Sequence, residues 1–354
     1  MKIILKAFLL LSACQLFSVS AFAQGSLTPP GAPTPTMKSL DEIDAKLEKR
    51  TPISSAPFTI NTSGSYYLTA NLTVTTGSAV TITVDDVTLD LNGFTISSTA
   101  SPASGTGVLI SGVHRNVSVK HGNIRGTTTV SAGVFTTGGF VSGVSGTAGA
   151  SGNIQVRDVN VAGIGGEGIN LSVSTPSSRN IIEHCTASVC SGTGLRAGSV
   201  INSKADSSGG ARIIANIVSN CFGESLGGSA THHGINGVVV VENSVGIAAV
   251  GDGIHGGAQV SNSHGTSVSG IGLVADGAQN SQGVSSSGTG VNATTATNCI
   301  GTSTSGSFGI NASIASFCRA TRNGGTAIAA TTAIGCVVLG TGTVTATNKF
   351  LGTP

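Results

Sequence analysis

Three histidines and one aspartate stand at a spacing that could support proton transfer. His233 follows His232 directly, Asp252 comes nineteen residues after His233, and His255 lies three positions beyond Asp252. An imidazole beside a carboxylate can act as a general acid or base, and the same groups can ligate a metal. A solvated polar turn is the simpler interpretation of these residues.

These side chains can contact one another only if the chain folds into repeats whose length matches their spacing in the sequence. From residue 182 onward a column of Cys and Ser recurs every eighteen or nineteen residues, with one longer interval of twenty-three between Cys221 and Ser244. The longer interval predicts an outward loop, and it contains Glu224, His232 and His233. Loops on repeat proteins often carry function. The next interval, of nineteen, predicts that Asp252 lies beside His233 on the following repeat.

Several columns keep their residue type through this repeat. One column is aliphatic or Ala and comprises Ile182, Val200, Val218, Val241, Val260, Ala278, Ala296, Ala315 and Ala333. Two positions later, six consecutive repeats carry Asn, namely Asn202, Asn220, Asn243, Asn262, Asn280 and Asn298. An upstream column is again aliphatic and comprises Leu195, Ile213, Ile235, Ile254, Leu273, Val291, Ile310 and Ile328. A bias toward Gly and Ser alone would not keep four such columns in register.

The period decides the fold class. Helical repeats need about 33 residues or more, whereas repeats of this length suit an all-β solenoid, the parallel β-helix, whose coils stack about 4.8 Å apart. We predict one solenoid of roughly a dozen coils over residues 58–340, followed by a C-terminal strand or tail at 341–354. The core would consist of the aliphatic columns.

The Val-x-Asn spacing predicts the orientation of the Asn column. Alternating residues of a strand share a face, so Val and Asn should both point inward. A buried amide needs hydrogen-bond partners, and the Asn residues above and below it could supply them. The sequence therefore predicts a buried asparagine ladder that serves a structural role.

The cysteines fall mainly in the column that follows the Asn residues. That column alternates with Ser and contains Cys185, Cys221, Cys299, Cys318 and Cys336. Stacked side chains run parallel instead of facing one another, which disfavours disulfides. We therefore expect packed thiols. Cys190 lies outside the column and receives no role.

The N-terminal region predicts export. Residues 1–23 resemble a signal peptide, with Lys2 before an apolar run and a small-x-small pattern ending at Ala23. A cut before Cys14, with lipid attached to that residue, is the alternative. Residues 24–57 then give a Pro-rich linker and a short helix, interpreted as a cap on the next domain or as an oligomerisation helix. No later stretch is apolar enough for a transmembrane segment.

Composition excludes several partners. Charged residues make up 9% of the chain and the net charge is +2, so there is no basic field for nucleic acid or anionic lipid. The chain has no Trp and only 2 Tyr, which provides poorly for the stacking of sugars on aromatic rings.

Three early segments carry a family resemblance. GSYYLTANLTV (64–74), VTLDLNGFTIS (87–97) and NVSVKHGNIRG (116–126) resemble the first coils of secreted bacterial right-handed parallel β-helix proteins of the pectin-lyase-like superfamily. The resemblance implies that fold, right-handed, and a location outside the cytoplasm, either secreted or at the cell surface or periplasm of a bacterium. It says little about activity, because this superfamily mixes lyases, hydrolases, adhesins and structural proteins.

The resemblance also gives enzymatic patterns for comparison. Polygalacturonase-like enzymes carry paired Asp residues, a Gly-His-Gly and an Arg-x-Lys, of which only His255-Gly256 has a counterpart here. Pectate-lyase-like enzymes use a calcium-binding acidic cluster. Asp85, Asp86 and Asp90 could bind calcium, but strand alternation points them apart. We therefore expect no cofactor.

Two functional hypotheses follow. The favoured one is an exported, non-catalytic scaffold of the surface or matrix, with weak binding of extracellular polysaccharide. The alternative is a polysaccharide lyase or glycoside hydrolase with a site near His233, Asp252 and His255, with His232 as a further candidate. Substrate and oligomeric state stay open.

Overall fold

A computed structural model describes Glu42 and residues 49–146, 152–171, 179–226, 228–350 and 352. The predicted signal 1–23, Cys14 and nearly all of the predicted capping helix lie outside the described residues. Among those described, no helix has the length and apolar character needed to span a membrane.

The structure consists of short strands, most of which join one sheet of 32 strands. In its N-terminal half the strands are β1 Thr51–Ile53, β2 Phe58–Ile60, β3 Gly64–Leu68, β4 Leu72–Val74, β5 Val80–Ile82, β6 Val87–Asp90, β7 Thr95–Ser98, β8 Thr106–Ile110, β9 Arg115–Arg125, β10 Thr129–Ser131, β11 Val134–Thr136, β12 Ser142–Gly146, β13 Gly152–Ile164, β14 Glu167–Asn170, β15 Ile181–Glu183 and β16 Thr186–Cys190. The remaining strands are β17 Leu195–Ile201, β18 Lys204–Ser208, β19 Ile213–Ser219, β20 Phe222–Ser225, β21 Ile235–Glu242, β22 Val245–Ala248, β23 Ile254–Gly256, β24 Gln259–Ser261, β25 His264–Ser267, β26 Leu273–Gln279, β27 Gln282–Ser285, β28 Val291–Thr297, β29 Ile300–Ser303, β30 Ile310–Ser316, β31 Arg319–Thr321, β32 Thr326–Ile334, β33 Val337–Leu339 and β34 Thr343–Phe350.

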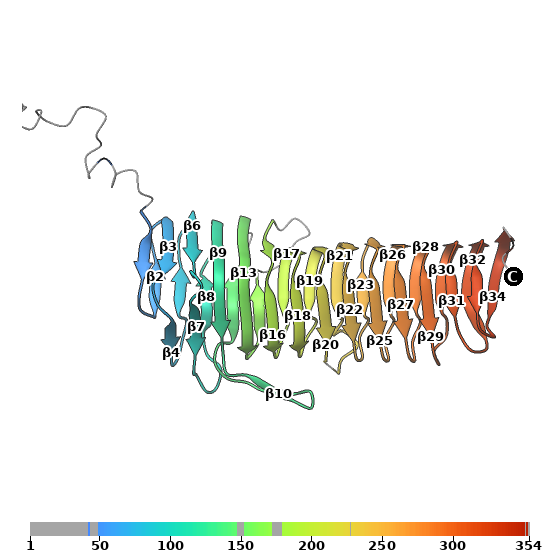
Figure 1. The fold of residues 1–354 in the computed structure, drawn as a ribbon, viewed down its shortest axis with the longest axis horizontal. Coiled ribbons are helices and arrows are strands. Elements are labelled where there is room, and N and C mark those ends of the chain that lie inside the picture. The colour runs from blue at the N-terminus through green and yellow to red at the C-terminus, as the bar shows by residue number, and fades with distance from the viewer. Residues whose placement is uncertain are drawn as a thin grey trace, which may run out of the picture. The chain divides into compact units, whose positions relative to one another are not determined.

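Each strand pairs in parallel with the strand one coil further on, so that the chain winds as a solenoid (Figure 1). Only the hairpin β10–β11 is antiparallel among the described strands. Parallel strands joined by crossovers within one sheet are almost always connected with a right-handed turn. The predicted parallel β-helix is therefore the fold of the described residues from 50 onward.

The predicted columns are confirmed as stacked residues. Ile182 pairs with Val200, Val200 with Val218, and so on through the column to Ala333. The upstream aliphatic column stacks in the same way, and all of its members from Leu195 to Ile328 are fully buried. The burial of these two columns from water is the main force that holds the coils together.

The solenoid extends beyond its predicted bounds at the N-terminal end. β1 lies inside the segment 24–57 that was predicted as linker and helix, yet it pairs with β3. The patterns used for prediction start later because the first coils are less regular. At the other end, the predicted terminal strand or tail 341–354 contains β34, which pairs with β32 as a further coil.

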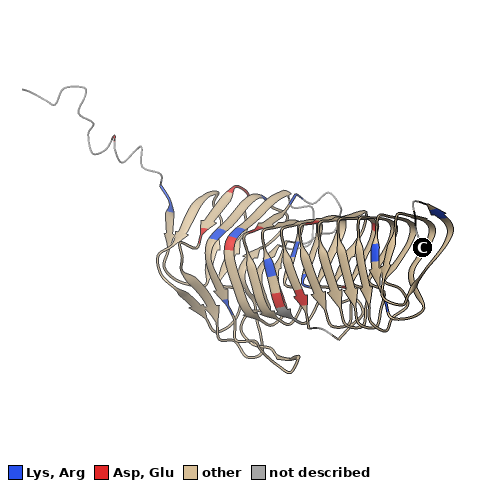
Figure 2. Ribbon diagram, turned by 45° about the vertical axis from the view of Figure 1, so that its right-hand side comes forward, with Lys and Arg blue, Asp and Glu red and all other residues tan. Residues whose placement is uncertain are grey.

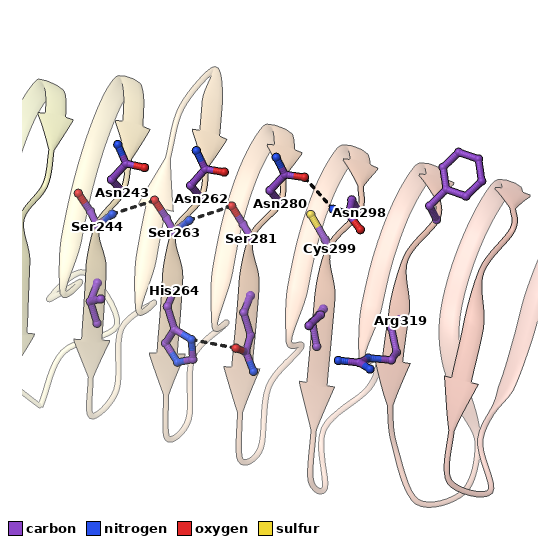
Figure 3. Close-up of a pocket in the computed structure, with 14 residues that line it drawn as sticks. Asn243, Ser244, Asn262, Ser263, His264, Asn280, Ser281, Asn298, Cys299 and Arg319 are labelled. Carbon is purple, nitrogen blue, oxygen red and sulfur yellow. Dashed lines mark hydrogen bonds between the residues drawn. The ribbon is translucent and has the colours of Figure 1, made fainter.

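The asparagine column is stacked as predicted, but its predicted inward orientation is wrong. All six residues are exposed, and their φ angles lie between +49° and +54°. A residue in this left-handed conformation turns the chain sharply, so the in–out alternation of the preceding strand stops there. Asn tolerates this conformation better than most residues. The ladder thus forms an external corner, where Asn298 Nδ2 donates to Asn280 Oδ1 over 2.8 Å (Figure 3).

The Ser and Cys column fills the interior behind this corner. Ser244 N donates to Ser263 Oγ over 3.2 Å, and Ser263 Oγ donates to the carbonyl oxygen of Ser261 over 2.7 Å. The column therefore supplies partners for backbone groups that the corner leaves outside the strand ladder. The six described cysteines are buried and none forms a disulfide, which confirms the predicted packed thiols. Burial raises the pKa of Cys185 to about 12 and that of Cys221 to about 11.

Phe317 offers a test of the corner. It occupies the ladder column with a φ of +53° and is 60% exposed. Replacing Phe317 by Asn should stabilise the protein by about 1 kcal/mol, because a bulky residue in this conformation is strained. Urea unfolding would measure this as a higher midpoint. Asn280→Phe is the matched reverse change and should lower the midpoint; equal midpoints for both variants would contradict the role assigned to the corner.

Candidate functional site

The longest repeat interval forms an outward loop, as predicted. β20 ends at Ser225 and β21 begins at Ile235, and the connection between them carries His232 and His233. A register shift between Ala215 and Ile217 absorbs the rest of the insertion as an irregularity in the pairing of β19 with β21. The loop is tied at its end, because Gly234 N donates to the carbonyl oxygen of Asp252 over 3.0 Å.

Asp252 and His255 form a hydrogen-bonded pair on the next coil. His255 Nδ1 lies 2.8 Å from Asp252 Oδ2, and the other carboxylate oxygen accepts the backbone N–H of Ile271 over 2.9 Å. The carboxylate is therefore fixed at both oxygens. Because Nδ1 of His255 donates to it, the neutral ring carries its lone pair on Nε2. The Asp252 side chain is 14% exposed and that of His255 is 44% exposed.

His233 stacks on this pair. Its ring centroid lies 4.6 Å from that of His255, with an angle of 24° between the planes. His233 Nδ1 accepts the backbone N–H of Asp252 over 3.0 Å, so the neutral ring carries its proton on Nε2. The predicted contact between His233 and Asp252 is thus present, and it includes His255.

The two imidazoles are shifted in opposite directions. The hydrogen bond to Asp252 raises the pKa of His255 above its ordinary value of 6.5. Burial lowers the pKa of His233, and the neighbouring His255 adds to this effect. When the surroundings of two titratable groups move their pKa values apart, one group is suited to act as an acid and the other as a base. The neutral form is therefore favoured for His233 and the protonated form for His255.

The geometry favours proton transfer over metal binding. His233, Asp252 and His255 offer ligand atoms within 4.8 Å of one another. The lone pair of His233 Nδ1, however, already accepts the N–H of Asp252, and His255 Nδ1 already donates to the Asp252 carboxylate. A metal at these atoms would have to replace both hydrogen bonds.

His232 and Glu224 do not join the cluster. The group of three that the structure brings together contains neither residue. His232 instead shapes the loop, since its N–H donates to the carbonyl oxygen of Ser229 over 3.0 Å. Glu224 accepts a hydrogen bond from Arg212 Nε through its backbone carbonyl. Of the two adjacent histidines, the structure thus brings only His233 to Asp252 and His255.

A groove of about 790 Å³ runs from His255 toward the C-terminal coils. Its floor consists of alanines on successive coils, which stack as Ala275, Ala293, Ala312 and Ala330. One wall carries His255, Asn292 and Asn311 in a single register, and the other carries Asp276, Thr294, Ser313 and Thr331.

The groove is almost uncharged. Asp276 and His255 are its only titratable lining residues among those described, and no Lys or Arg lines it. Figure 2 shows that most of the charged residues lie on the N-terminal coils and few on the C-terminal ones. The lining therefore offers amide and hydroxyl hydrogen bonds at the spacing of the coils, about 4.8 Å.

Solved structures that are similar to this chain include the following three. The A-module of mannuronan C-5 epimerase AlgE6 from Azotobacter vinelandii has 14% identity and a TM-score of 0.44, covering 82% of this chain and 90% of that chain. The AlgE4 A-module from the same organism has 14% identity and a TM-score of 0.38, covering 82% and 90%. The Dettilon tailspike protein has 12% identity and a TM-score of 0.35, covering 74% and 58%. No family model and no curated protein matches the chain.

This chain is a right-handed parallel β-helix. That is the fold which the resemblance implied, and identities this low transfer no activity. What the β-helix does has to be argued from its own residues.

The corner column continues toward the N-terminus beyond His184, which the repeat already places in it. His121, Asp158 and His184 share its left-handed conformation and precede Asn202 in register. His121 Nε2 lies 3.7 Å from an oxygen of Asp158, and Asn202 Nδ2 lies 3.2 Å from His184 Nε2. The β-helix therefore has a charged section at the N-terminal end of the ladder. The repeat became irregular there, so spacing alone gave no signal.

The predicted calcium candidates have separate partners. Asp85 bonds to His114 over 2.9 Å, which lowers the pKa of that carboxyl. Asp86 accepts from Asn116 over 2.8 Å, and Asp90 lies 3.4 Å from Arg50.

Proposed function

We propose that this β-helix binds an extended polysaccharide along the groove and that His255 performs acid–base chemistry on it. The observation that carries the proposal is the Asp252–His255 pair at the end of a groove lined by amides and hydroxyls. The sequence alone favoured a non-catalytic scaffold. The Asp252–His255 pair at the groove makes us favour a catalytic role instead. An export signal, as predicted for residues 1–23, would place the protein where such polymers occur.

An extended sugar chain suits the lining. Its hydroxyls can exchange hydrogen bonds with Asn292, Asn311 and Thr294 on successive coils, while the small alanines of the floor allow the chain to approach the backbone. Apolar pockets for the side chains of a peptide are missing from the lining residues. Because no cation lines the groove, polymers with few carboxylates should bind better than highly acidic ones.

The Asp252–His255 pair can support some proton-transfer reactions better than others. His255 Nε2 can remove a proton when neutral, and Asp252 stabilises the imidazolium that forms. Glycoside hydrolysis normally uses two carboxyl groups flanking the bond, whereas elimination needs one base and one proton donor. We therefore favour a lyase-type elimination at a uronate unit. His255 removes the proton from the carbon that bears the carboxyl group, a C=C bond forms as the neighbouring C–O bond breaks, and the imidazolium of His255 returns its proton to the leaving oxygen. The N–H of His233 is a positioning donor.

A panel of acidic and neutral polysaccharides tests the proposal. Wild-type protein should bind at least one polymer and release unsaturated products from it. New reducing ends without unsaturation would support proton transfer but replace elimination by hydrolysis. Binding without any product across the panel would return the protein to the scaffold hypothesis.

The pH profile should carry the signature of His255. A base must be deprotonated, and the pKa of His255 is raised above 6.5, so kcat/KM should fall as pH drops through this raised pKa. In Asp252→Asn the hydrogen bond to a carboxylate is lost, and the acidic limb should move to lower pH. A limb that stays in place in this variant would contradict the assignment.

A further inference from the structure

A second groove, of about 890 Å³, lies beside the asparagine corner (Figure 3). Four asparagines of the corner column stand along one side of it, namely Asn243, Asn262, Asn280 and Asn298. The buried column of Ser and Cys forms its floor. The residues that line this groove include none of those that line the groove at His255. It is therefore a separate concave surface, to which the proposed catalysis gives no role.

The C-terminal end of this groove differs from the rest. There the corner column carries Phe317 in place of Asn, and Arg319 follows two residues later on the same coil. The phenyl ring lies against Gly335 of the next coil, where an added Cβ atom would come within 2.9 Å of the ring. Phe317 is nevertheless mostly exposed. The groove thus ends in an aromatic ring that is supported by the backbone and accessible to a ligand.

Arg319 brings a positive charge without a counter-ion to this end of the groove (Figure 3). The residue is exposed, and the ion pairs of the described arginines involve Arg50, Arg157 and Arg196 instead. Among the described residues, no Asp or Glu lines the groove. A guanidinium that no carboxylate of the protein neutralises can bind the carboxylate of a ligand through two parallel hydrogen bonds.

The asparagines next to this end offer one donor and one acceptor. Asn298 Nδ2 donates to Asn280 Oδ1 over 2.8 Å, so Asn280 Nδ2 and Asn298 Oδ1 keep no partner among the described residues. The two amides lie one coil apart, a spacing of about 4.8 Å, which is close to the length of one sugar unit in an extended chain. Neighbouring sugar units can therefore each reach one amide.

The conformation of Phe317 argues for a ligand on its ring. Asn tolerates the left-handed corner and fills this column on six consecutive coils, whereas a bulky residue with a φ of +53° is strained. Burial does not compensate for the strain, because the side chain stays mostly in water. Backbone strain of this kind is concentrated at sites that bind ligands.

We propose that Asn280, Asn298, Phe317 and Arg319 bind a uronate-containing oligosaccharide without converting it. One face of a pyranose ring packs on the phenyl ring, where both surfaces lose their contact with water. The carboxylate of the sugar pairs with the Arg319 guanidinium, and the two amides bind hydroxyls of the neighbouring units. The site does not depend on catalysis at His255.

The test is a calorimetric titration with oligogalacturonate, with its methyl ester as the neutral comparison. His255→Gln protein serves as the parent, so that the ligand is not consumed. The acid should bind about tenfold more tightly than the ester, because only the acid carries the carboxylate. Arg319→Gln should weaken binding of the acid by the same factor and leave that of the ester unchanged.

Phe317→Asn should weaken the binding of both ligands by about fivefold, since both pack on the ring. This variant is expected to be more stable than the parent, so its loss of binding cannot come from unfolding. A Phe317→Asn protein that binds both ligands as tightly as the parent would exclude the ring from the site and overturn the proposal.

Two control variants limit the site. Arg125→Gln removes another exposed arginine, at the end of β9 and outside the groove, and should bind the acid like the parent. His264→Gln changes the coil before the one that carries Asn280, beyond the proposed site, and should also bind like the parent. Weaker binding in either control, by as much as in Arg319→Gln, would show a diffuse effect of charge or stability and overturn the proposal.

Three further results would overturn the proposal. They are a parent that binds neither ligand, equal affinity for acid and ester, and an Arg319→Gln variant that binds the acid like the parent. Binding that is lost in Asn311→Ala but kept in Arg319→Gln would place the ligand in the groove at His255 and exclude the second site. None of these results decides whether His255 is catalytic, because that role is measured by product formation in the wild type.

Discussion

Replacing His255 by Gln should lower the rate of product formation by about 10²–10⁴-fold, which is the usual contribution of a general base. Gln keeps a polar side chain of similar length but cannot accept and release the proton. Binding to the groove should change little, because Asn292, Asn311 and Thr294 remain. The measurement is kcat and KM on the polysaccharide that wild-type protein converts, and the loss should fall on kcat.

His264→Gln is the control for this change. His264 is also partly buried, and its Nε2 lies 2.9 Å from Thr266 Oγ1, but it borders the groove beside the asparagine corner and not the one that begins at His255. Its activity should equal that of the wild type. If His255→Gln retained activity within a factor of about ten, the general-base role would be excluded, since the lost contribution would be smaller than such catalysis provides.

Replacing Gly253 by Ala should destabilise the protein by about 3 kcal/mol and abolish activity. A Cβ atom at this position would lie 2.3 Å from the backbone nitrogen of Thr266 and 2.7 Å from the carbonyl oxygen of Gly272. Both contacts are with backbone atoms, so no side chain can move aside. Two stretches of the coil lie close together here, and Gly253 directly follows Asp252. The clash should therefore displace the carboxylate as well as loosen the coil.

The test compares the free energies of unfolding of the Gly253→Ala and Gly228→Ala variants, measured by urea unfolding. A Cβ at Gly228 meets nothing within 4 Å, so that variant should stay within about 0.5 kcal/mol of the wild type. The predicted difference comes from steric clash of the added Cβ atom and not from backbone strain, because neither residue has a positive φ. A Gly253→Ala protein with wild-type midpoint and activity would mean that the two stretches of the coil are less closely packed than described.

The candidate site was partly predictable for a physical reason. A regular repeat fixes which residues stack, and so a spacing of one repeat length placed Asp252 beside His233. The spacing could not place His255, which reaches the carboxylate by turning back along its own coil. Nor could it exclude His232, since the direction of a loop side chain depends on turns that follow no repeat.

The sequence by itself determined that the chain is a solenoid, which columns are buried and which residues lie above one another. These follow from the period and from the burial of aliphatic side chains, both of which are properties of the pattern. Only the tertiary structure decided that the asparagines face outward, because one left-handed residue per coil resets the alternation of the strand. It also decided that a row of alanines becomes the floor of a groove, since concavity depends on the angle between two strand segments and not on their composition.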